Sequence, residues 1–339
     1  MEQPGDDDDD ELDEDVVEED QFGRIRYLEL CQELQISPVS QILKFLESEE
    51  MHITHYGLGL NGTVALVGAL ELNTSLTALR LPHNNIPDEA LRSLASCLVS
   101  NHNITELDLS GNRIGVQGSK ALAELLDSRS CALRVLNCSH MHMSDREVVP
   151  LAAALENNQS LATLDLSNND LGEKAGLALG NMLGINITLN ELELSWNKLR
   201  TKGVAYIAEG LKPNLALQVL GLAWCGIQDA GAAALGGTFK INHGLVDVDF
   251  CGNGIGPEGA VALAAGIAQS TSLAAVALDN NDFREEGGRA LLKALEMNRG
   301  IVICRVENTN ISQELRIAAD ALLAPRMAAQ RASQQFIND

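Results

Sequence analysis

The stretch Leu161-Ala-Thr-Leu-Asp-Leu-Ser-Asn-Asn169-Asp-Leu171 decides the fold, because its pattern recurs along most of the chain. Apolar residues stand at its first, fourth, sixth and eleventh positions, and asparagine stands at its ninth. Copies begin at residues 76, 104, 133, 161, 189, 217, 245, 273 and 301, so that successive copies are 28 residues apart except for one spacing of 29. A weaker copy at Ser48, with Met51, Ile53 and Leu58 in register, brings the number of repeats to ten.

Each repeat combines a short strand with a helix. The alternation Leu107-Asp-Leu109 is typical of a strand, whereas residues 119–126 place apolar side chains at helical spacing. A chain that returns to the same strand position in every repeat forms parallel strands with helices on one side. Neighbouring strands lie about 4.8 Å apart and packed helices about 8 to 10 Å apart, so the stack must bend. We therefore expect an α/β horseshoe solenoid with parallel concave strands and convex helices.

The recurrent asparagine has a predicted backbone role. Its side-chain amide can satisfy turn N–H and carbonyl groups that the bend leaves unpaired in the interior. Cys225 is an accepted substitute at this position, whereas Tyr56, Met141 and Thr309 depart from the pattern. The asparagines that follow the pattern are Asn84, Asn112, Asn169, Asn197, Asn253 and Asn281.

The chain divides into four predicted parts. Residues 1–21 form a disordered acidic tail, because Asp6 to Asp20 holds twelve carboxylates in fifteen residues and no Lys or Arg. Residues 22–47 form an N-terminal helical cap with helices over 24–35 and 38–47. The ten repeats occupy residues 48–311. Residues 312–339 form a C-terminal helical cap and tail, with a helix over 312–323 that Pro325 interrupts.

Charge and composition exclude several classes of partner. Without the tail acids and Glu2, the formal net charge of −23 falls to −10, which disfavours nucleic acid and anionic membranes. No apolar run approaches the ~20 residues that span a bilayer, and the N-terminus is too acidic for a secretory signal. These features predict a cytoplasmic protein whose seven cysteines stay free and whose Asn-x-Ser/Thr matches stay unmodified. We expect no cofactor and no metal.

The repeats resemble the ribonuclease-inhibitor type of leucine-rich repeat, the 28-residue class also found in the GTPase-activating protein for Ran and in Nod-like receptors. The resemblance covers residues 48–311 and implies the horseshoe fold, while family members inhibit, activate or sense. Three segments near the N-terminus are similar to leucine-rich repeat-containing protein 74, types A and B: Tyr27-Leu-Glu-Leu-Cys31, Ile36-Ser-Pro-Val-Ser40 and Ile53-Thr-His-Tyr-Gly-Leu58. This similarity implies a ciliary or axonemal location as an alternative to the general cytoplasm.

The predicted concave face is acidic. Residues two, four and six after each repeat start point away from the leucine core. Only Arg80 and Arg305 are basic there, so the face should attract a basic protein partner; the alternative is a merely solubilising surface. The acidic residues at these positions are Glu106, Asp108, Asp165, Glu191, Glu193, Asp247, Asp249 and Asp279, with Glu50 and Glu307 at the two ends.

Two tryptophans stand seven residues after neighbouring repeat starts. Trp196 and Trp224 are the only tryptophans in the chain, and their shared phase predicts that they stack side by side. An exposed aromatic pair beside a charged concavity has the composition of an interface hot spot, although the rings could instead cover the turns below them. His55 and His83 occupy the same phase, but two ligands do not make a structural zinc site.

We therefore predict a non-enzymatic scaffold that binds a basic protein partner on its acidic concave face, with Trp196 and Trp224 in the contact. The Cys, His and Ser residues fall at repeat positions rather than in an arrangement of a nucleophile with its base. Two alternatives remain open: a regulator of a small GTPase of the Ran-activator type, and an architectural component contacted through its convex helices. The repeat pattern leaves the oligomeric state undetermined.

Overall fold

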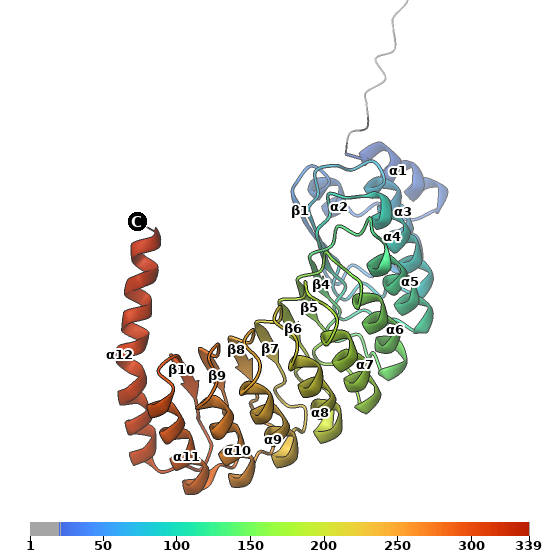
Figure 1. Cartoon of the computed structure of the whole chain (residues 1–339). Coiled ribbons are helices and arrows are strands. Elements are labelled where there is room, and N and C mark those ends of the chain that lie inside the picture. Colours follow the sequence, from blue (N-terminus) through green and yellow to red (C-terminus); the bar gives the residue numbers. More distant parts are fainter. Residues whose placement is uncertain (1–19, 21, 339) are drawn as a thin grey trace, which may run out of the picture.

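The fold comes from a computed structural model, which describes residues 20 and 22–338. Ten parallel strands form a single sheet in chain order, and consecutive strands are joined by a helix. Figure 1 shows the strands on the inner side of an arc and the helices on its outer side. The predicted α/β horseshoe solenoid is confirmed. Residues 1–19 and 21, which carry most of the predicted acidic tail, lie outside the described residues.

Strand pairing follows the predicted repeat phase. Leu107 lies opposite Leu79 on one side and Leu136 on the other, and all three side chains are buried. Glu50 pairs with Ala78, so the weak first copy is part of the sheet. The ten strands are β1 Glu50–His52, β2 Ala78–Arg80, β3 Glu106–Asp108, β4 Val135–Asn137, β5 Thr163–Asp165, β6 Glu191–Glu193, β7 Val219–Gly221, β8 Asp247–Asp249, β9 Ala275–Ala277 and β10 Ile303–Arg305.

The helices between the strands bury their apolar faces against the sheet and against each other. In α5, for example, the buried residues include Leu122, Leu125 and Leu126, which form part of one continuous core. The repeat helices are α3 Gly59–Leu70, α4 Asp88–Ser100, α5 Val116–Asp127, α6 Asp145–Leu155, α7 Glu173–Leu183, α8 Arg200–Leu211, α9 Gln228–Phe239, α10 Pro257–Ile267 and α11 Arg284–Met297.

The recurrent asparagines connect each repeat to the one before it, as the sequence predicts. The Asn197 amide donates to the carbonyls of Leu166 and Leu194 at 2.9 and 2.8 Å, and its oxygen accepts from the Leu171 N–H at 3.0 Å. Cys225 substitutes for asparagine by donating its thiol to the Leu194 carbonyl at 3.1 Å. We call the edge where this ladder lies the strand-end edge, because it follows the strands.

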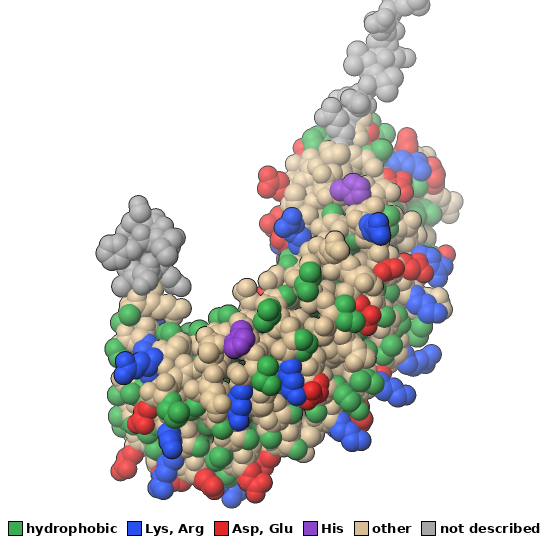
Figure 2. All heavy atoms as spheres, in the orientation of Figure 1, with side chains coloured by type: hydrophobic (Ala, Val, Ile, Leu, Met, Phe, Trp, Pro, Cys, Tyr) green, Lys and Arg blue, Asp and Glu red, His purple; other side chains and the backbone are tan. Residues whose placement is uncertain are grey.

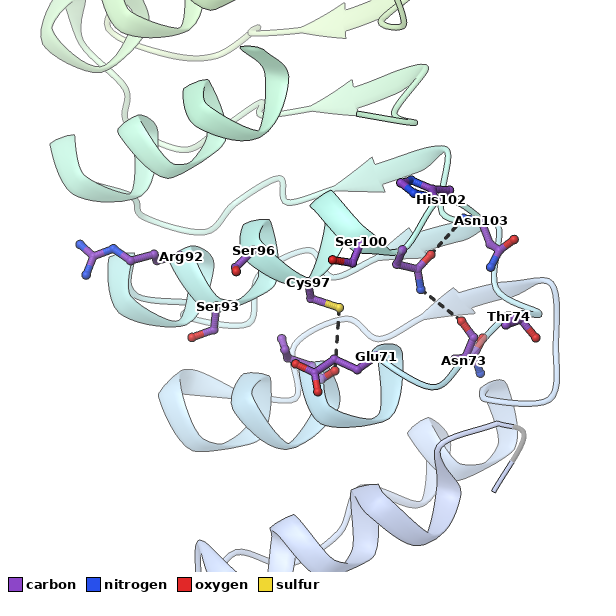
Figure 3. A pocket seen from close by; sticks show the side chains of 12 residues that line it. Glu71, Asn73, Thr74, Arg92, Ser93, Ser96, Cys97, Ser100, His102 and Asn103 are labelled. Atoms are coloured by element: carbon purple, nitrogen blue, oxygen red, sulfur yellow. Dashed lines mark hydrogen bonds between the residues drawn. The ribbon is translucent and has the colours of Figure 1, made fainter. Parts of the chain in front are cut away.

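A second asparagine ladder, which the sequence reasoning missed, runs along the opposite edge, where the strands begin. Asn101 donates to the Leu70 and Asn73 carbonyls at 2.8 and 3.1 Å and accepts from the Asn103 N–H at 3.0 Å. Dashed lines in Figure 3 mark the bonds that reach Asn73 and Asn103. The signal was an asparagine three residues before most repeat starts, partly hidden among the Asn-x-Ser/Thr matches. Its members are Asn73, Asn101, Asn158, Asn186, Asn214, Asn242 and Asn298, each buried.

The N-terminal cap consists of α1 Arg24–Glu33 and α2 Ser40–Phe45, both shorter than predicted. Tyr27 is buried, and its hydroxyl accepts a hydrogen bond from the Val39 N–H at 3.0 Å, which holds the chain extended before α2 begins. Asp20, assigned from sequence to the tail, accepts hydrogen bonds from the Ile25 and Arg26 N–H groups at 3.1 and 2.8 Å. This carboxylate therefore stabilises the first turn of α1.

The predicted interruption at Pro325 is wrong, because α12 runs from Gln313 to Asn338 with Pro325 inside it. Proline removes one helical hydrogen bond at a cost of about 3 kcal/mol. Contacts with the last repeat offset this cost. The Arg326 guanidinium donates to the carbonyls of Leu295, Asn298 and Ile301 at 2.7 to 3.0 Å. Arg326 lies one repeat length after Asn298, so it ends the second ladder.

Asn158→Ala should destabilise the solenoid, because it leaves the Leu126 carbonyl and the Leu161 N–H without their partners at 2.7 and 2.8 Å. We expect a loss of about 2 to 4 kcal/mol in the free energy of unfolding, measured by urea denaturation. Asn157→Ala is the matched control, since Asn157 is exposed. Equal effects of the two substitutions would contradict a structural role for the second ladder.

Candidate functional site

The concave face carries the acidic residues that the sequence assigned to it. Strand register places Glu106, Glu191 and Asp247 at one strand position, and Asp108, Asp165, Glu193 and Asp249 at the position two residues later. The residue between the two positions is buried in every one of these strands. Carboxylates far apart in the sequence therefore share one surface.

The two concave arginines neutralise the ends of this surface. Arg80 forms ion pairs with Glu50 at 2.5 Å and with Glu106 at 2.8 Å. Arg305 reaches from β10 to Asp249 at 3.4 Å and to Asp279 at 3.3 Å. Three of the predicted partner-binding acids, Glu106, Asp249 and Asp279, are thus already paired within the chain.

The middle of the face keeps its charge. We call Asp165, Glu191, Glu193 and Asp247 the central acids; within the described part of the chain none of them has an ion pair. Burial raises the pKa of Glu193, and repulsion from Asp165 and Asp249 raises it as well, whereas hydrogen bonds from Ser195 lower it. Burial and repulsion from Asp249 also raise the pKa of Asp247, opposed by Arg305. Ionising these carboxylates costs free energy in the folded chain.

Some of the acids also have a structural role that the sequence reasoning missed. Asp108 accepts a hydrogen bond from the Ser110 N–H, and Asp165 accepts one from the Ser167 N–H, both at 2.8 Å. Asp249 does the same for Cys251 at 2.9 Å. In these three turns one carboxylate oxygen accepts the hydrogen bond; the other oxygen of Asp249 is already paired with Arg305, whereas Asp108 and Asp165 form no ion pair among the described residues.

A hollow of about 240 Å³ opens among the central acids over β7 to β10. Gly221 leaves room for one of its walls, because the Glu193 carboxylate occupies the space where a Cβ of residue 221 would be. Small and apolar side chains form the floor, and Glu193, Asp247, Asp249 and Arg305 stand around it. The floor residues are Val219, Gly221, Ala275, Ala277 and Ile303.

Trp196 and Trp224 stack on each other at the strand-end edge, directly after β6 and β7. Their ring centroids are 4.9 Å apart with an interplanar angle of 17°. The side chains are 54% and 43% exposed, so the rings only partly cover the turns below them. The stack rests on Gly252, because the Trp224 ring occupies the space where a Cβ of residue 252 would be. Both tryptophans have left-handed backbone, with φ of 60° and 57°.

His55 and His83 form a similar stack at the N-terminal end of the same edge. Their centroids are 4.5 Å apart with an interplanar angle of 10°, and the His83 ring lies over Gly111. Stacked parallel rings do not converge on one ion. Among the described residues no group of three His, Cys, Asp or Glu side chains is placed to hold a metal.

The hollow between α3 and α4 on the helical side lacks a catalytic arrangement. Figure 3 shows Cys97 facing Glu71, with Ser93, Ser96 and Ser100 along the same helix. Burial, together with the nearby charge of Glu71, raises the pKa of the Cys97 thiol to about 11, so the thiol is protonated at neutral pH. No histidine or carboxylate is hydrogen-bonded to these serine hydroxyls within the described residues.

Comparison with known proteins agrees with this geometry. A family model described as "Leucine Rich repeat" matches residues 72–95, 100–123, 157–180, 186–208, 214–236 and 242–264. The chain therefore has the fold of a leucine-rich repeat solenoid. The described residues include no helix that is long and apolar enough to cross a bilayer.

Among curated proteins, this leucine-rich repeat chain is similar to parts of much longer proteins. It is 32% identical over 123 residues to NACHT, LRR and PYD domains-containing protein 12 of Homo sapiens, which is 36% of this chain and 12% of that protein. It is 37% identical over 97 residues to NACHT, LRR and PYD domains-containing protein 3 of Bos taurus, or 29% of this chain and 9% of that protein. The chain therefore aligns with about a tenth of the length of these relatives.

Two solved structures are also similar. The Rad7 and Elc1 complex of yeast matches at 15% sequence identity with a TM-score of 0.44, over 87% of this chain and 90% of that chain. Leiomodin-1 actin-binding site 2 matches at 16% identity with a TM-score of 0.42, over 49% of this chain and 95% of that chain.

Gly252→Ala should disturb the tryptophan stack, because its new methyl group overlaps the Trp224 ring. Gly254→Ala is a matched control: Gly254 has nearly the same φ, 64° against 65°, but no atom lies within 4 Å of its Cβ position. Both substitutions carry a backbone cost of about 1 kcal/mol. Only the first should change tryptophan fluorescence and near-ultraviolet circular dichroism of the folded chain. Identical spectra for all three proteins would show that Gly252 does not support the stack.

Glu193→Gln should stabilise the fold at neutral pH. The pKa of Glu193 is higher in the folded chain than in the unfolded chain, so protonated Glu193 favours folding, and this contribution is lost as the pH rises. At pH 7 the ionised carboxylate therefore lowers the free energy of unfolding of the wild type, and glutamine removes this penalty. Glutamine keeps an oxygen for the Ser195 N–H, which lies 2.7 Å from the carboxylate. The melting temperature should exceed that of the wild type at pH 7, and the difference should vanish below about pH 4.

Glu191→Gln provides the control for this measurement, since Glu191 is exposed on the same strand. A Glu193→Gln protein that melts lower than the wild type at pH 7 would contradict the assigned direction of the pKa shift.

Proposed function

We propose that this protein is a non-enzymatic scaffold that binds a basic segment of a protein partner on its concave face. Leucine-rich repeat domains generally mediate protein–protein interaction, and the curved sheet provides the surface for it. The observation that carries the proposal is a coincidence in space. The central acids and the Trp196–Trp224 stack belong to repeats in the middle of the array, and the hollow lined by Glu193 and Asp247 extends from there to the last strand, β10.

The electrostatics favour a cationic partner. The central acids lack ion pairs within the described chain. Burial and repulsion raise the pKa values of Glu193 and Asp247, and the charge of a bound cation would offset this cost of ionisation. A lysine or arginine side chain fits such a site, since its apolar stem can contact Val219 and Ala275 while its charged head meets the carboxylates. The acidic field would also accelerate encounter with a basic surface.

The tryptophans supply the anchoring surface. Left-handed backbone costs a bulky residue about 1 kcal/mol or more, and asparagine or glycine holds this position in several other repeats, as at Asn168 and Gly252. The fold therefore does not require tryptophan at either position. Partly exposed stacked indoles offer apolar area and a π-face for cationic side chains.

The cysteines and the charge of the concave face bear on where the protein is located. We place the protein in the cytoplasm, with a ciliary location as a narrower version. All seven cysteines are free, and burial raises the thiol pKa values of six of them. Buried protonated thiols fit a reducing compartment and do not act as nucleophiles. The acidic concave face disfavours nucleic acid as its ligand.

The test is affinity capture from native tissue with the immobilised full chain, followed by mass spectrometry and measurement of dissociation constants. Trp196→Ala with Trp224→Ala should weaken specific partners by about thirtyfold or more, as loss of a hot spot does. Glu191→Lys with Asp247→Lys should weaken the same partners by at least about tenfold at physiological salt.

Glu124→Lys with Glu258→Lys is the control, since both residues are exposed on the helices and the change in net charge is the same. Circular dichroism verifies folding of each variant. If the helical charge reversal removes partners that both concave variants retain, the concave site is not the binding surface and the architectural alternative holds.

A further inference from the structure

An apolar patch lies on the edge where the strands begin, opposite the strand-end edge that carries the two tryptophans. Ile187 is 82% exposed and Leu215 is 66% exposed, and more than half of the surface of Ile185 and Ile241 is also open. These four residues, the strand-start patch, lie in the turns before β6, β7 and β8, which are three consecutive repeats. Large exposed apolar surfaces of this kind indicate an interaction site.

The fold does not require these apolar residues. The equivalent turn before β5 carries Asn157 and Gln159, and the turn before β9 carries Gln269 and Thr271. The buried residue between the two positions, an asparagine such as Asn186 or Ser270 before β9, makes the structural hydrogen bonds of the turn. Polar residues are therefore compatible with this edge, and the patch needs another explanation.

Hollows lie on both sides of Ile185 and Ile187. One, of about 300 Å³, is lined by these two isoleucines together with Pro213 and Leu215. The other is larger, lies toward the turns before β4 and β5, and includes Leu126 and Cys131 in its lining. It opens where the repeat of 29 residues brings Ser130 in place of a ladder asparagine. Figure 2 shows hydrophobic side chains over the front face of the middle of the solenoid, with charged side chains along the outer rim.

Charged residues lie on the two sides of the patch in a symmetric order. Counting from the turn before β6, Glu156 is one turn earlier and Lys212 one turn later, whereas Asp127 is two turns earlier and Lys240 two turns later. Lys212 pairs with Glu209 at 2.5 Å. Asp127, Glu156 and Lys240 have no ion pair among the described residues.

We infer that the strand-start patch is the interface between two copies of this chain, related by a two-fold axis through the turn before β6. A two-fold axis brings each turn before it against the equivalent turn after it on the other copy. Glu156 then meets the lysine at position 212 of the second copy, and Asp127 meets the lysine at position 240. Leu215 and Ile241 of each copy enter the other's hollow before β5.

This interface is separate from the proposed concave site. Each strand begins at the edge that carries the strand-start patch and ends at the strand-end edge. The dimer therefore leaves Trp196, Trp224 and the central acids exposed. The inference does not depend on the proposed function, and either can fail without the other.

Sedimentation equilibrium of the full chain, at about 0.15 M salt and up to about 100 μM protein, tests the interface. The wild type should be a dimer. Leu215→Asp with Ile241→Asp should weaken it at least a hundredfold, and Met297→Asp should not, although Met297 is 62% exposed at the equivalent position before β10. A monomeric wild type, or a dimer indifferent to the first pair of substitutions, would overturn the inference.

Charge reversal tests the two-fold arrangement itself. Asp127→Lys alone and Lys240→Asp alone should each weaken the dimer about tenfold, because like charges then meet across the axis. The variant with both substitutions should recover the wild-type dissociation constant, because opposite charges meet again if positions 127 and 240 face each other across the axis. Additive weakening in that variant would overturn the two-fold arrangement. Circular dichroism confirms that each variant is folded.

Discussion

Buried asparagine amides tie most turns of the solenoid to their neighbours, and the remaining structure depends on this coupling. A strand of three residues provides few backbone hydrogen bonds, and the bend leaves carbonyl and N–H groups unpaired at both of its ends. Asn197 satisfies such groups at one edge, and Asn158 does so at the other. Because each amide bonds to groups in two repeats, the repeats stay in constant phase.

Constant phase turns a linear pattern into surfaces. Side chains one repeat apart become neighbours, so Trp196 stacks on Trp224 and the Glu193 carboxylate lies over Gly221. Burial, together with repulsion from nearby carboxylates, raises the pKa values of Glu193 and Asp247. Glycine completes two of these arrangements, since Gly252 and Gly221 leave the space that a ring and a carboxylate occupy.

The three free surfaces of the ribbon differ in chemistry. The concave face is acidic in its middle, the strand-end edge carries the tryptophan stack, and the strand-start edge carries the apolar patch around Ile187. Since every repeat contributes to each surface, substitutions on one surface leave the backbone hydrogen bonds of the others in place. The partner that we propose for the concave face and the second copy that we propose for the strand-start edge would therefore occupy different surfaces of one chain.

The sequence by itself determined the horseshoe, the ten repeats, the position of the acids on the concave face and the pairing of Trp196 with Trp224. All of these follow from the repeat phase along the chain. Tertiary structure alone decided which charges remain free: Arg80 and Arg305 reach across strands to neutralise the outer acids. It also decided the hollow over Gly221 and the passage of α12 through Pro325, which Arg326 holds on the last repeat. Phase specifies which residues are neighbours, whereas the reach and rotamer of long side chains depend on the packed surroundings.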